Sequence, residues 1–219
     1  MIEGRAAERP LAVFVDYDGT ITDVDTFDIL VRAYAGPGAW EELEAQLARG
    51  TITLREAMNR QASFVRGSID EADDLLRRSA TFDPSFAGFA HACRRRHVPL
   101  AIVSSGIRQV IRRALRRNGA GDVTLFAGDL IASPDGWTLA YPGDDPNGLG
   151  KASFVERAQR AGYRVVYAGD GRSDFEAARL ADLRFAKRGK ALAEHLEREG
   201  LAFTAFSSFS SVQRALELD

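Results

Sequence analysis

The chain has 219 residues, of which 45% are hydrophobic and 27% are charged, a composition typical of a globular protein and not of a disordered or fibrous one. Its formal net charge of −2 argues against a general electrostatic attraction to nucleic acid. No apolar run approaches the roughly 20 residues of a membrane-spanning helix, so we expect no membrane association. The single cysteine, Cys93, cannot form an internal disulfide, which fits the cytoplasmic location that we expect.

The first ten residues carry no recognisable structural signal. They lack the hydrophobic core of a signal peptide, and Ile2-Glu3-Gly4-Arg5 looks like an engineered protease site, so we expect residues 1–10 to be disordered or tag-like. An apolar run follows at residues 11–15. It is short enough to be a buried strand, and Gly19-Thr20 turns the chain out of it.

The next segment is helical. Residues 22–80 contain no convincing strand run, and hydrophobic spacing predicts helices separated by Gly-, Pro- and Ser-containing stretches. The predicted helices are residues 26–34, 39–49, 54–65 and 69–79. We interpret residues 23–80 as a small helical cap inserted between the first and second strands.

From Asp83-Pro84 onward, helices and strands alternate. The predicted strands are residues 98–103, 123–126, 164–167, 183–185 and 202–203, with a hairpin within 127–150. The predicted helices are residues 86–97, 107–117, 152–161, 174–180, 190–199 and 210–216. Such alternation favours parallel βαβ units with right-handed crossovers. The predicted fold is therefore α/β, a Rossmann-like parallel sheet core formed by residues 11–22 and 81–219.

Two carboxylates follow the first strand. Asp16 and Asp18 are two residues apart on an extended segment, so their side chains point the same way. They lie at the strand's carboxyl end, where open parallel sheets bind ligands. Two anions so close repel each other unless one is protonated or a cation lies between them. A pair divided between nucleophile and proton donor, with a divalent metal ion on the first, meets that constraint.

Three further clusters follow predicted strands. Ser104-Ser105-Gly106 offers a hydroxyl group and backbone N–H groups at an expected strand-to-helix turn, which suits an anion. Lys151 precedes a predicted helix and could neutralise a phosphate and an aspartate together. The segment from Gly169 to Asp174 reads Gly-Asp-Gly-Arg-Ser-Asp, and its glycines permit close backbone approach to a ligand.

In their order and spacing, these clusters resemble the motifs of the haloacid dehalogenase superfamily of phosphohydrolases. The first motif is Asp16-Tyr17-Asp18-Gly19-Thr20, the second Ser104, the third Lys151, and the fourth the Gly169–Asp174 segment. The resemblance covers almost the whole chain. The inserted helices are similar to the family's first cap type, as in phosphoserine phosphatases.

The resemblance implies a Mg²⁺-dependent phosphomonoester hydrolase that acts through an aspartyl-phosphate. Asp16 would be the nucleophile and Asp18 the acid and base. Asp16, the backbone carbonyl of Asp18 and Asp170 would hold Mg²⁺, or Mn²⁺ in its place. The resemblance also implies that Asp174 orients metal-bound water or Lys151. The residues that it implies for binding phosphate or substrate are Ser104, Lys151, Thr20, Asp25, Ser105 and Gly106.

The substrate is expected to be a small phosphorylated metabolite. Aligned without gaps, phosphoserine phosphatases have a Glu at Asp25 and an Arg at Gln61, although a one-residue shift would bring Arg60 to that place. The Asp-Gly-Thr-Ile-Thr form of the first motif and Phe203-Thr204-Ala205-Phe206 look more like the phosphatases of methionine salvage, which act on a methylthio-ketopentenyl phosphate. We therefore favour an uncharged or weakly polar substrate body, with phosphoserine as the alternative.

Other classes remain open at this point. A phosphotransferase would share the aspartyl-phosphate and differ only in the acceptor. A phospho-receiver module also carries an acceptor aspartate, but receivers are shorter and have no cap. A nucleic-acid binder would rest on Arg94-Arg95-Arg96 and the arginines of residues 112–117, with no interleaved aromatic residues. The sequence does not indicate an oligomeric state.

A cap implies motion. We expect it to open and close over the site, with hinges near residues 22–25 and 79–84. Asp25 and the helix predicted at 54–64 are the expected substrate contacts of the cap. Alternatively, the apolar residues Leu54, Met58 and Phe64 of that helix form the cap's own core.

Overall fold

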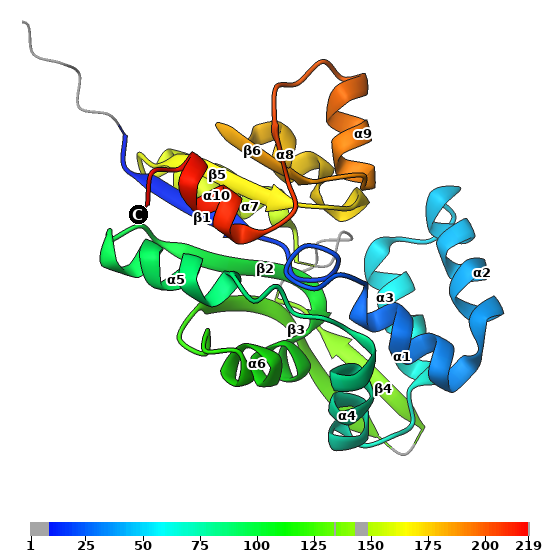
Figure 1. The fold of residues 1–219 in the computed structure, drawn as a ribbon. Helices are drawn as coiled ribbons and strands as arrows, with labels where there is room; N and C mark the ends of the chain where they lie inside the picture. The colour runs from blue at the N-terminus through cyan, green and yellow to red at the C-terminus, as the bar shows by residue number, and fades with distance from the viewer. Residues whose placement is uncertain (1–8, 134, 143–148, 219) are drawn as a thin grey trace, which may run out of the picture.

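A seven-stranded sheet organises the part of the chain that the computed structural model describes, residues 9–133, 135–142 and 149–218 (Figure 1). The strands are β1 (Leu11–Val15), β2 (Leu100–Ile107), β3 (Thr124–Ser133), β4 (Gly136–Ala140), β5 (Arg164–Gly169), β6 (Leu183–Lys187) and β7 (Thr204–Phe206). Their order is β4-β3-β2-β1-β5-β6-β7, and every neighbouring pair is parallel except β3 and β4. This confirms the predicted α/β fold class.

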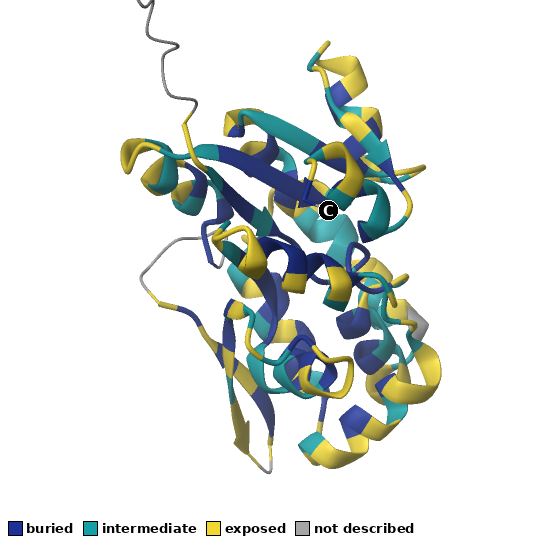
Figure 2. Cartoon of the chain, turned by 60° about the vertical axis from the view of Figure 1, so that its left-hand side comes forward, coloured by how far each residue is buried: buried dark blue, intermediate teal, exposed yellow. Residues whose placement is uncertain are grey.

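Helices cover both faces of the sheet. One face packs against α5 (Phe86–Arg95), α6 (Arg108–Arg117) and α10 (Phe209–Ala215), and the other against α7 (Lys151–Arg160), α8 (Phe175–Leu180) and α9 (Ala191–Arg198). Burial on both faces explains why the central strands read as continuous apolar runs, and Figure 2 shows them as the most buried part of the fold. In the strand order of the sheet, β1 is the central strand.

Between β1 and α5 the chain forms four inserted helices: α1 (Thr26–Ala35), α2 (Pro37–Ala48), α3 (Leu54–Phe64) and α4 (Ile69–Ser79). The chain leaves and re-enters the sheet layer at adjacent points, where Thr22 and Phe82 form an antiparallel bridge. The backbone N–H of Asp23 donates to the carbonyl of Thr81 at 3.0 Å. Figure 1 shows α1, α2 and α3 grouped beyond one end of the strands.

The β3–β4 hairpin packs against the inserted helices. Trp137, at 1% exposure, donates from its Nε1 to the carbonyl of Gly67 at 3.0 Å. The backbone N–H of Leu139 donates to Asn59 Oδ1 of α3 at 2.9 Å. A Cβ on Gly136 would lie 2.3 Å from the carbonyl oxygen of Ser63, so this glycine allows the hairpin its close approach to α3.

The largest differences from the predicted strands are in β2, β3 and β7; β5 and β6 each extend two residues further than predicted. β2 continues through Ser104-Ser105-Gly106 to Ile107, with an irregular register against β3 after Val103, so these residues end a strand and do not form a separate turn. β3 continues without a break into the hairpin, because its second half pairs with β4 and has an exposed face that needs no apolar run. β7 covers Thr204–Phe206 and so follows the strand predicted at 202–203, because pairing with β6 begins only at Thr204.

The first described residues extend the core. Arg9 forms an ion pair with Asp182, and the carbonyl of Pro10 accepts from the N–H of Arg164 at 2.8 Å. The remainder of the predicted N-terminal segment, residues 1–8, lies outside the described residues. Among the described helices, none combines the length and apolar character needed to cross a bilayer. The cytoplasmic location stays a prediction.

Candidate active site

Asp16 follows directly from the central strand. Its backbone N–H donates to the carbonyl of Ala168, at 2.9 Å, which extends the β1–β5 ladder by one residue. Its Oδ1 accepts from the N–H of Tyr17 at 2.7 Å and lies 2.9 Å from Nζ of Lys151. The side chain is only 7% exposed. The sheet therefore fixes this carboxylate at the carboxyl end of β1, as predicted.

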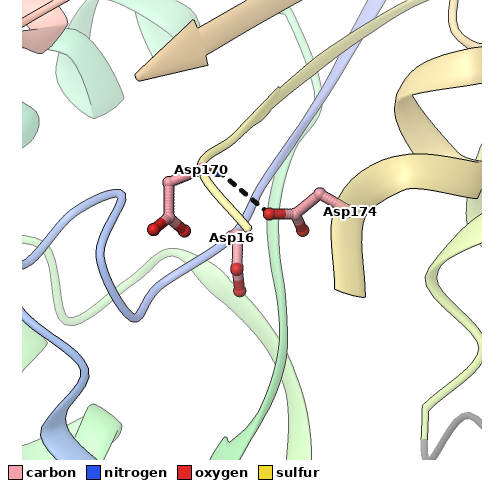
Figure 3. Close-up of side chains that lie close together, drawn as sticks. All are labelled: Asp16, Asp170 and Asp174. Atoms are coloured by element: carbon pink, nitrogen blue, oxygen red, sulfur yellow. Dashed lines mark hydrogen bonds between the residues drawn. The ribbon is translucent and has the colours of Figure 1, made fainter. Parts of the chain in front are cut away.

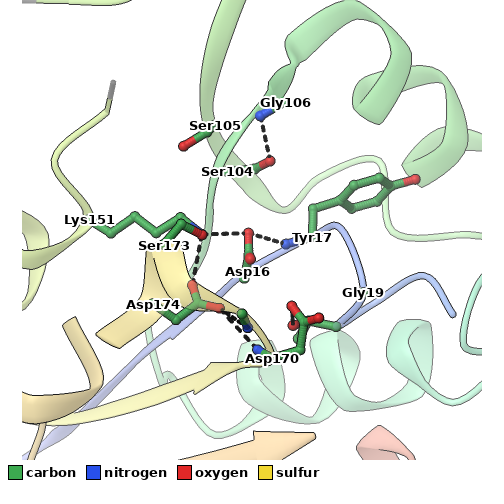
Figure 4. Close-up of polar contacts among 12 residues, drawn as sticks. Asp16, Tyr17, Gly19, Ser104, Ser105, Gly106, Lys151, Asp170, Ser173 and Asp174 are labelled. Atoms are coloured by element: carbon green, nitrogen blue, oxygen red, sulfur yellow. Dashed lines mark hydrogen bonds and ion pairs between the residues drawn. The ribbon is translucent and has the colours of Figure 1, made fainter. Parts of the chain in front are cut away.

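Lys151 is the first residue of α7 and points into the same region (Figure 4). Gly150, with a φ of 62°, turns the chain into the helix. The ammonium group donates to Asp174 Oδ1 at 2.7 Å and to Ser173 Oγ at 2.9 Å. One buried lysine therefore joins the carboxylates that follow β1 and β5.

Asp174 is fully used as a hydrogen-bond acceptor. Its Oδ2 accepts from the N–H groups of Asp170 and Gly171, both at 3.0 Å, and its Oδ1 accepts from the hydroxyl of Tyr167 at 2.7 Å. A Cβ on Gly169 would lie 2.5 Å from Asp174 Oδ2, so the glycine leaves room for this carboxylate. The arrangement holds Asp174 in place beneath Lys151.

Asp170 faces Asp16 from the loop after β5. Asp16, Asp170 and Asp174 each offer a carboxylate oxygen, and these oxygens lie within 4.8 Å of one another (Figure 3). Thr20 Oγ1 donates to Asp170 Oδ1 at 3.1 Å. Gly19 has a φ of +70°, and a Cβ there would lie 2.1 Å from Asp170 Oδ2. The turn after β1 thus requires glycine for two separate reasons.

The carboxylates outnumber the lysine that balances them. Burial raises the pKa of Asp16 well above its usual value, and the charge of Asp174 adds to the rise while Lys151 opposes it. Burial and Asp174 raise the pKa of Asp170 to about 6. Burial also acts on Asp174, but Lys151 and the hydrogen bonds hold its pKa below the usual value. The excess negative charge and the hard oxygen donors fit a divalent cation between Asp16 and Asp170.

Asp18 is bonded to the first inserted helix. Its Oδ1 accepts from the N–H of Thr26 at 2.9 Å and from the Thr26 hydroxyl group. Burial raises the pKa of Asp18 to about 7, with Asp25 as the next cause. Asp25 caps α1, accepting from the N–H groups of Phe27 at 2.8 Å and Asp28 at 3.1 Å. A carboxyl group with a pKa near neutrality can both give and take a proton.

The end of β2 faces Asp18 across the site. Ser104 Oγ accepts from the N–H of Gly106 at 2.9 Å. A Cβ on Gly106 would lie 2.8 Å from Asp18 Oδ2, so glycine keeps this approach open. Ser105 Oγ is buried without a hydrogen-bond partner, and the carbonyl of Ser105 accepts from the hydroxyl of Tyr141. These groups are placed to receive the oxygens of an anion.

A cavity of about 240 Å³ joins these groups. The predicted site residues that line it are Asp16, Asp18, Asp25, Ser104, Ser105, Gly106, Lys151 and Asp170. Thr20 and Asp174 are fully buried beside it and contact Asp170 and Lys151 respectively. The structure therefore brings all the predicted residues into one region, eight of them onto the cavity wall.

The inserted helices supply the outer wall of the cavity. Leu54 and Met58 line it and also pack in the hydrophobic cluster that contains Ala62 and Trp137, whereas Phe64 packs with Leu43, Ile52 and Ala57. Contact of this helix with the substrate stays a prediction. Gln61 lines the cavity and is 1% exposed, while Arg60 is exposed and bonds Gln46. Gln61, and not Arg60, therefore faces the cavity.

Several cavity residues were not predicted, among them Trp40, Glu44, Arg172 and Lys190. A separate omission is Lys187, whose Nζ donates to the carbonyl of Thr20 at 2.8 Å and so supports the first motif. One feature of the sequence could have indicated Lys187 and Lys190: lysine is rare in this chain, and most of its basic residues are arginine. Trp40 and Glu44 carried no signal, since only the folding of α2 onto α3 brings them to the cavity.

The arginine runs have partners within the chain. Arg112 donates to the carbonyls of Gly121 and Val123, and Arg108 donates to those of Leu125 and Ala127. Three further arginines each form an ion pair with an aspartate: Arg94–Asp122, Arg113–Asp70 and Arg117–Asp73. These contacts stabilise helix and loop ends, and they give no support to a nucleic-acid surface.

Comparison with known proteins places the chain in a family. The model of the haloacid dehalogenase-like hydrolases matches residues 13–179. The chain is 32% identical over 222 residues to Pdp3-interacting factor 1 of Schizosaccharomyces pombe, covering 97% of each protein. It is 29% identical to 2-hydroxy-3-keto-5-methylthiopentenyl-1-phosphate phosphatase of Brevibacillus brevis, over 95% of this chain and 96% of that one. It is 26% identical to the polyol phosphate phosphatase PYP1 of Saccharomyces cerevisiae, over 94% and 92%.

A solved structure shares the fold. A phospho-aspartyl intermediate analogue of phosphoserine phosphatase superposes with a TM-score of 0.72 at 18% identity, covering 95% of this chain and 99% of that one. The chain belongs to the haloacid dehalogenase-like hydrolase family, as its motifs predicted. It is a phosphatase enzyme of that family, so the phospho-receiver alternative is excluded.

Proposed function

We propose that the protein hydrolyses a small phosphomonoester through an aspartyl-phosphate formed on Asp16. One observation carries the proposal: Asp16, the proton-exchanging Asp18 and the cation of Lys151 face one cavity at the carboxyl end of the central strand. A nucleophile, an acid and base, and a positive charge are the groups that two-step phosphoryl transfer needs.

The first step transfers the phosphoryl group to the enzyme. A carboxylate oxygen of Asp16 attacks phosphorus, the bond to the ester oxygen breaks, and Asp18 gives its proton to the leaving alkoxide. In the second step, a water molecule attacks the phosphorus of the aspartyl-phosphate. Asp18 takes the proton of that water, and inorganic phosphate leaves as the Asp16 carboxylate is regenerated.

The metal ion that we propose is Mg²⁺. Asp16, Asp170 and the backbone carbonyl of Asp18 would hold it, and when bound it would neutralise charge on the phosphoryl oxygens and keep Asp16 ionised. Asp174 is less suited to bind it directly, because four hydrogen bonds already occupy its oxygens. We propose instead that Asp174 positions Lys151, and that Thr20 positions Asp170 and does not contact phosphate.

The phosphate oxygens would be held from the end of β2 and from α7. Ser104, Ser105 and Gly106 line the cavity near Asp18, and Lys151 adds a buried positive charge. The buried Ser105 hydroxyl, which has no partner in the free protein, supports this role. Fixed donors of this kind stabilise the charge that develops during phosphoryl transfer.

We propose residues 23–80 as the cap and residues 11–22 and 81–219 as the core. Thr22 and Phe82 form a bridge at the two points where the chain passes between core and cap, which supports these bounds. The cap would exclude water from the cavity when a phosphomonoester is bound. Asp25 and α3 would then face the substrate.

For the substrate, we favour a phosphomonoester with an uncharged or weakly polar body over phosphoserine. Gln61 lines the cavity at the position where the ungapped alignment gives phosphoserine phosphatases an arginine, and two relatives are named for methylthiopentenyl and polyol phosphates, which supports this preference. A phosphotransferase of the same family would use the same intermediate with an alcohol as acceptor. Release of inorganic phosphate in water as the main product would favour the hydrolase.

The test of the mechanism is Asp16→Asn. We expect turnover of a chromogenic phosphate to fall at least about 10³-fold, because the covalent step is lost. The variant should unfold at a temperature equal to or above that of the metal-free wild type, because burial disfavours the Asp16 charge. EDTA should abolish wild-type activity, and Mg²⁺ should restore it. Near-normal Mg²⁺-dependent hydrolysis by the variant would refute the mechanism.

A further inference from the structure

One buried polar group of the cavity has no role in the chemistry just described. Gln61 lies on α3, is 1% exposed and lines the cavity, yet its Oε1 has no hydrogen-bond partner. Buried polar atoms in native proteins are nearly always hydrogen-bonded, because an unsatisfied one loses its hydration without compensation. An amide left in this state on a cavity wall indicates a partner that arrives with a ligand.

The surroundings of Gln61 are mostly apolar. Trp40 and Leu47 of α2 and Leu54 and Met58 of α3 line the same cavity. These side chains all lie on the inserted helices, whereas the carboxylates of Asp16 and Asp170 belong to the core. They offer a carbon chain van der Waals contact, so the part of the substrate beyond the phosphate meets an apolar wall with a single amide in it.

The charged groups on that side are acidic. The inserted segment contributes Asp25 and Glu44 to the cavity wall, and within the described residues it contributes no lysine or arginine there. Arg172 reaches the cavity from the loop after β5, where its charge already acts on Glu44. A substrate carboxylate placed near Gln61 would face two acids, whereas a hydroxyl group carries no charge and can donate to Oε1.

We propose that Gln61 determines substrate specificity by accepting a hydrogen bond from a hydroxyl group on the uncharged carbon chain of the phosphomonoester. The substrate class is therefore a neutral, hydroxylated alkyl phosphate. This inference rests on the proposed phosphatase reaction and adds to it the recognition of the substrate body.

Three phosphates separate the possibilities. Glycerol 1-phosphate has hydroxyl groups, propyl phosphate has the same chain without them, and O-phospho-L-serine has a charged body. For the wild type, kcat/KM for glycerol 1-phosphate should exceed that for propyl phosphate by about 10-fold, the effect of one buried hydrogen bond, and should also exceed that for phosphoserine. A ratio near 1, or a preference for phosphoserine, would overturn the inference without any variant.

The variant Gln61→Met removes the amide and keeps the side-chain length. The ratio of kcat/KM for glycerol 1-phosphate to that for propyl phosphate should fall about 10-fold, to near 1. Gln46→Met, on α2 and half-exposed, is the matched control and should keep the wild-type ratio. If Gln61→Met does not fold, Gln61→Asn withdraws the amide from the cavity and should lower the same ratio. An unchanged ratio in the folded variant contradicts the role of Gln61.

Failure of the inference is distinguishable from failure of the proposed function. If the wild type with Mg²⁺ hydrolyses neither a chromogenic aryl phosphate nor any of the three phosphates, the proposed function itself fails. If it hydrolyses them in an Asp16-dependent manner but without preference for the hydroxylated chain, only the inference about Gln61 fails.

Discussion

At the scale of single residues, the site is a balance of buried charges. Lys151 lies between Asp16 and Asp174, and Asp170 adds a third carboxylate within 4.8 Å. Burial makes each negative charge costly unless a cation compensates it. The same residues therefore make the metal-free site unfavourable for the folded state and favourable for a divalent ion.

The charge on Asp170 should lower the stability of the metal-free protein as pH rises. Its pKa of about 6 in the folded protein lies above the usual value near 4, so the folded state binds this proton more tightly than the unfolded state does. The resulting stabilisation is complete below pH 4 and is lost as pH rises through 6, on the order of 1–3 kcal/mol. Asp170→Asn should therefore gain stability over the wild type between pH 4.5 and pH 7.5.

Denaturant unfolding in EDTA at these two pH values measures the effect. Equal changes in the free energy of unfolding for both proteins would contradict it. Adding Mg²⁺ at pH 7.5 should stabilise the wild type more than Asp170→Asn, because binding to the folded state alone raises its stability and the variant lacks a ligand.

At the scale of elements, ion pairs attach the last inserted helix to the core. Arg117 of α6 bonds both carboxylate oxygens of Asp73 on α4, at 2.7 and 2.6 Å, and the Asp73 side chain is only 12% exposed. The β3–β4 hairpin provides a second attachment for the inserted helices: Leu139 bonds Asn59 of α3, and Trp137 bonds the carbonyl of Gly67. The helices were predictable from their hydrophobic spacing and capping residues, but neither attachment was, since each joins residues far apart in sequence.

Removing this ion pair should destabilise the fold. Arg117→Met leaves the largely buried Asp73 carboxylate without a partner, and we expect a loss of about 1–3 kcal/mol in the free energy of unfolding. The double variant Arg117→Met/Asp73→Asn should lose less than the sum of the two single variants. Arg94→Met is the control, because the Arg94–Asp122 pair is exposed and should contribute less than about 1 kcal/mol. Equal losses for Arg94→Met and Arg117→Met would contradict the buried-pair argument.

At the scale of the whole molecule, the inserted helices are held unequally. α3 and α4 bond to the hairpin and to α6, whereas α2 is held by contacts to its neighbours, Arg32–Glu41 and Gln46–Arg60. α1 is bonded to the core through Thr26 and Asp18, so the expected lid motion should be concentrated in α2. This helix also carries Trp40 and Glu44, which line the cavity.

Hydrogen exchange can test where the motion lies. Adding Mg²⁺ with a phosphate mimic should slow backbone amide exchange in α2 more than in α4, because closing over the cavity orders the less attached helix. Asp16→Asn, which lacks the nucleophile, serves as the control for specific binding. Equal protection of α2 and α4 would indicate that the inserted helices move as one body, and no change at all would count against a lid.

By itself, the sequence determined the fold class, the insertion after the first strand and the catalytic motifs. These depend on local patterns: apolar runs, helical spacing, and polar residues that directly follow strands. The tertiary structure decided the extent of β2, β3 and β7, because strand ends depend on pairing with neighbours. It also decided that Gln61 and not Arg60 faces the cavity, and that Thr20 contacts Asp170. Such contacts bring together residues from distant segments, and no local pattern specifies them.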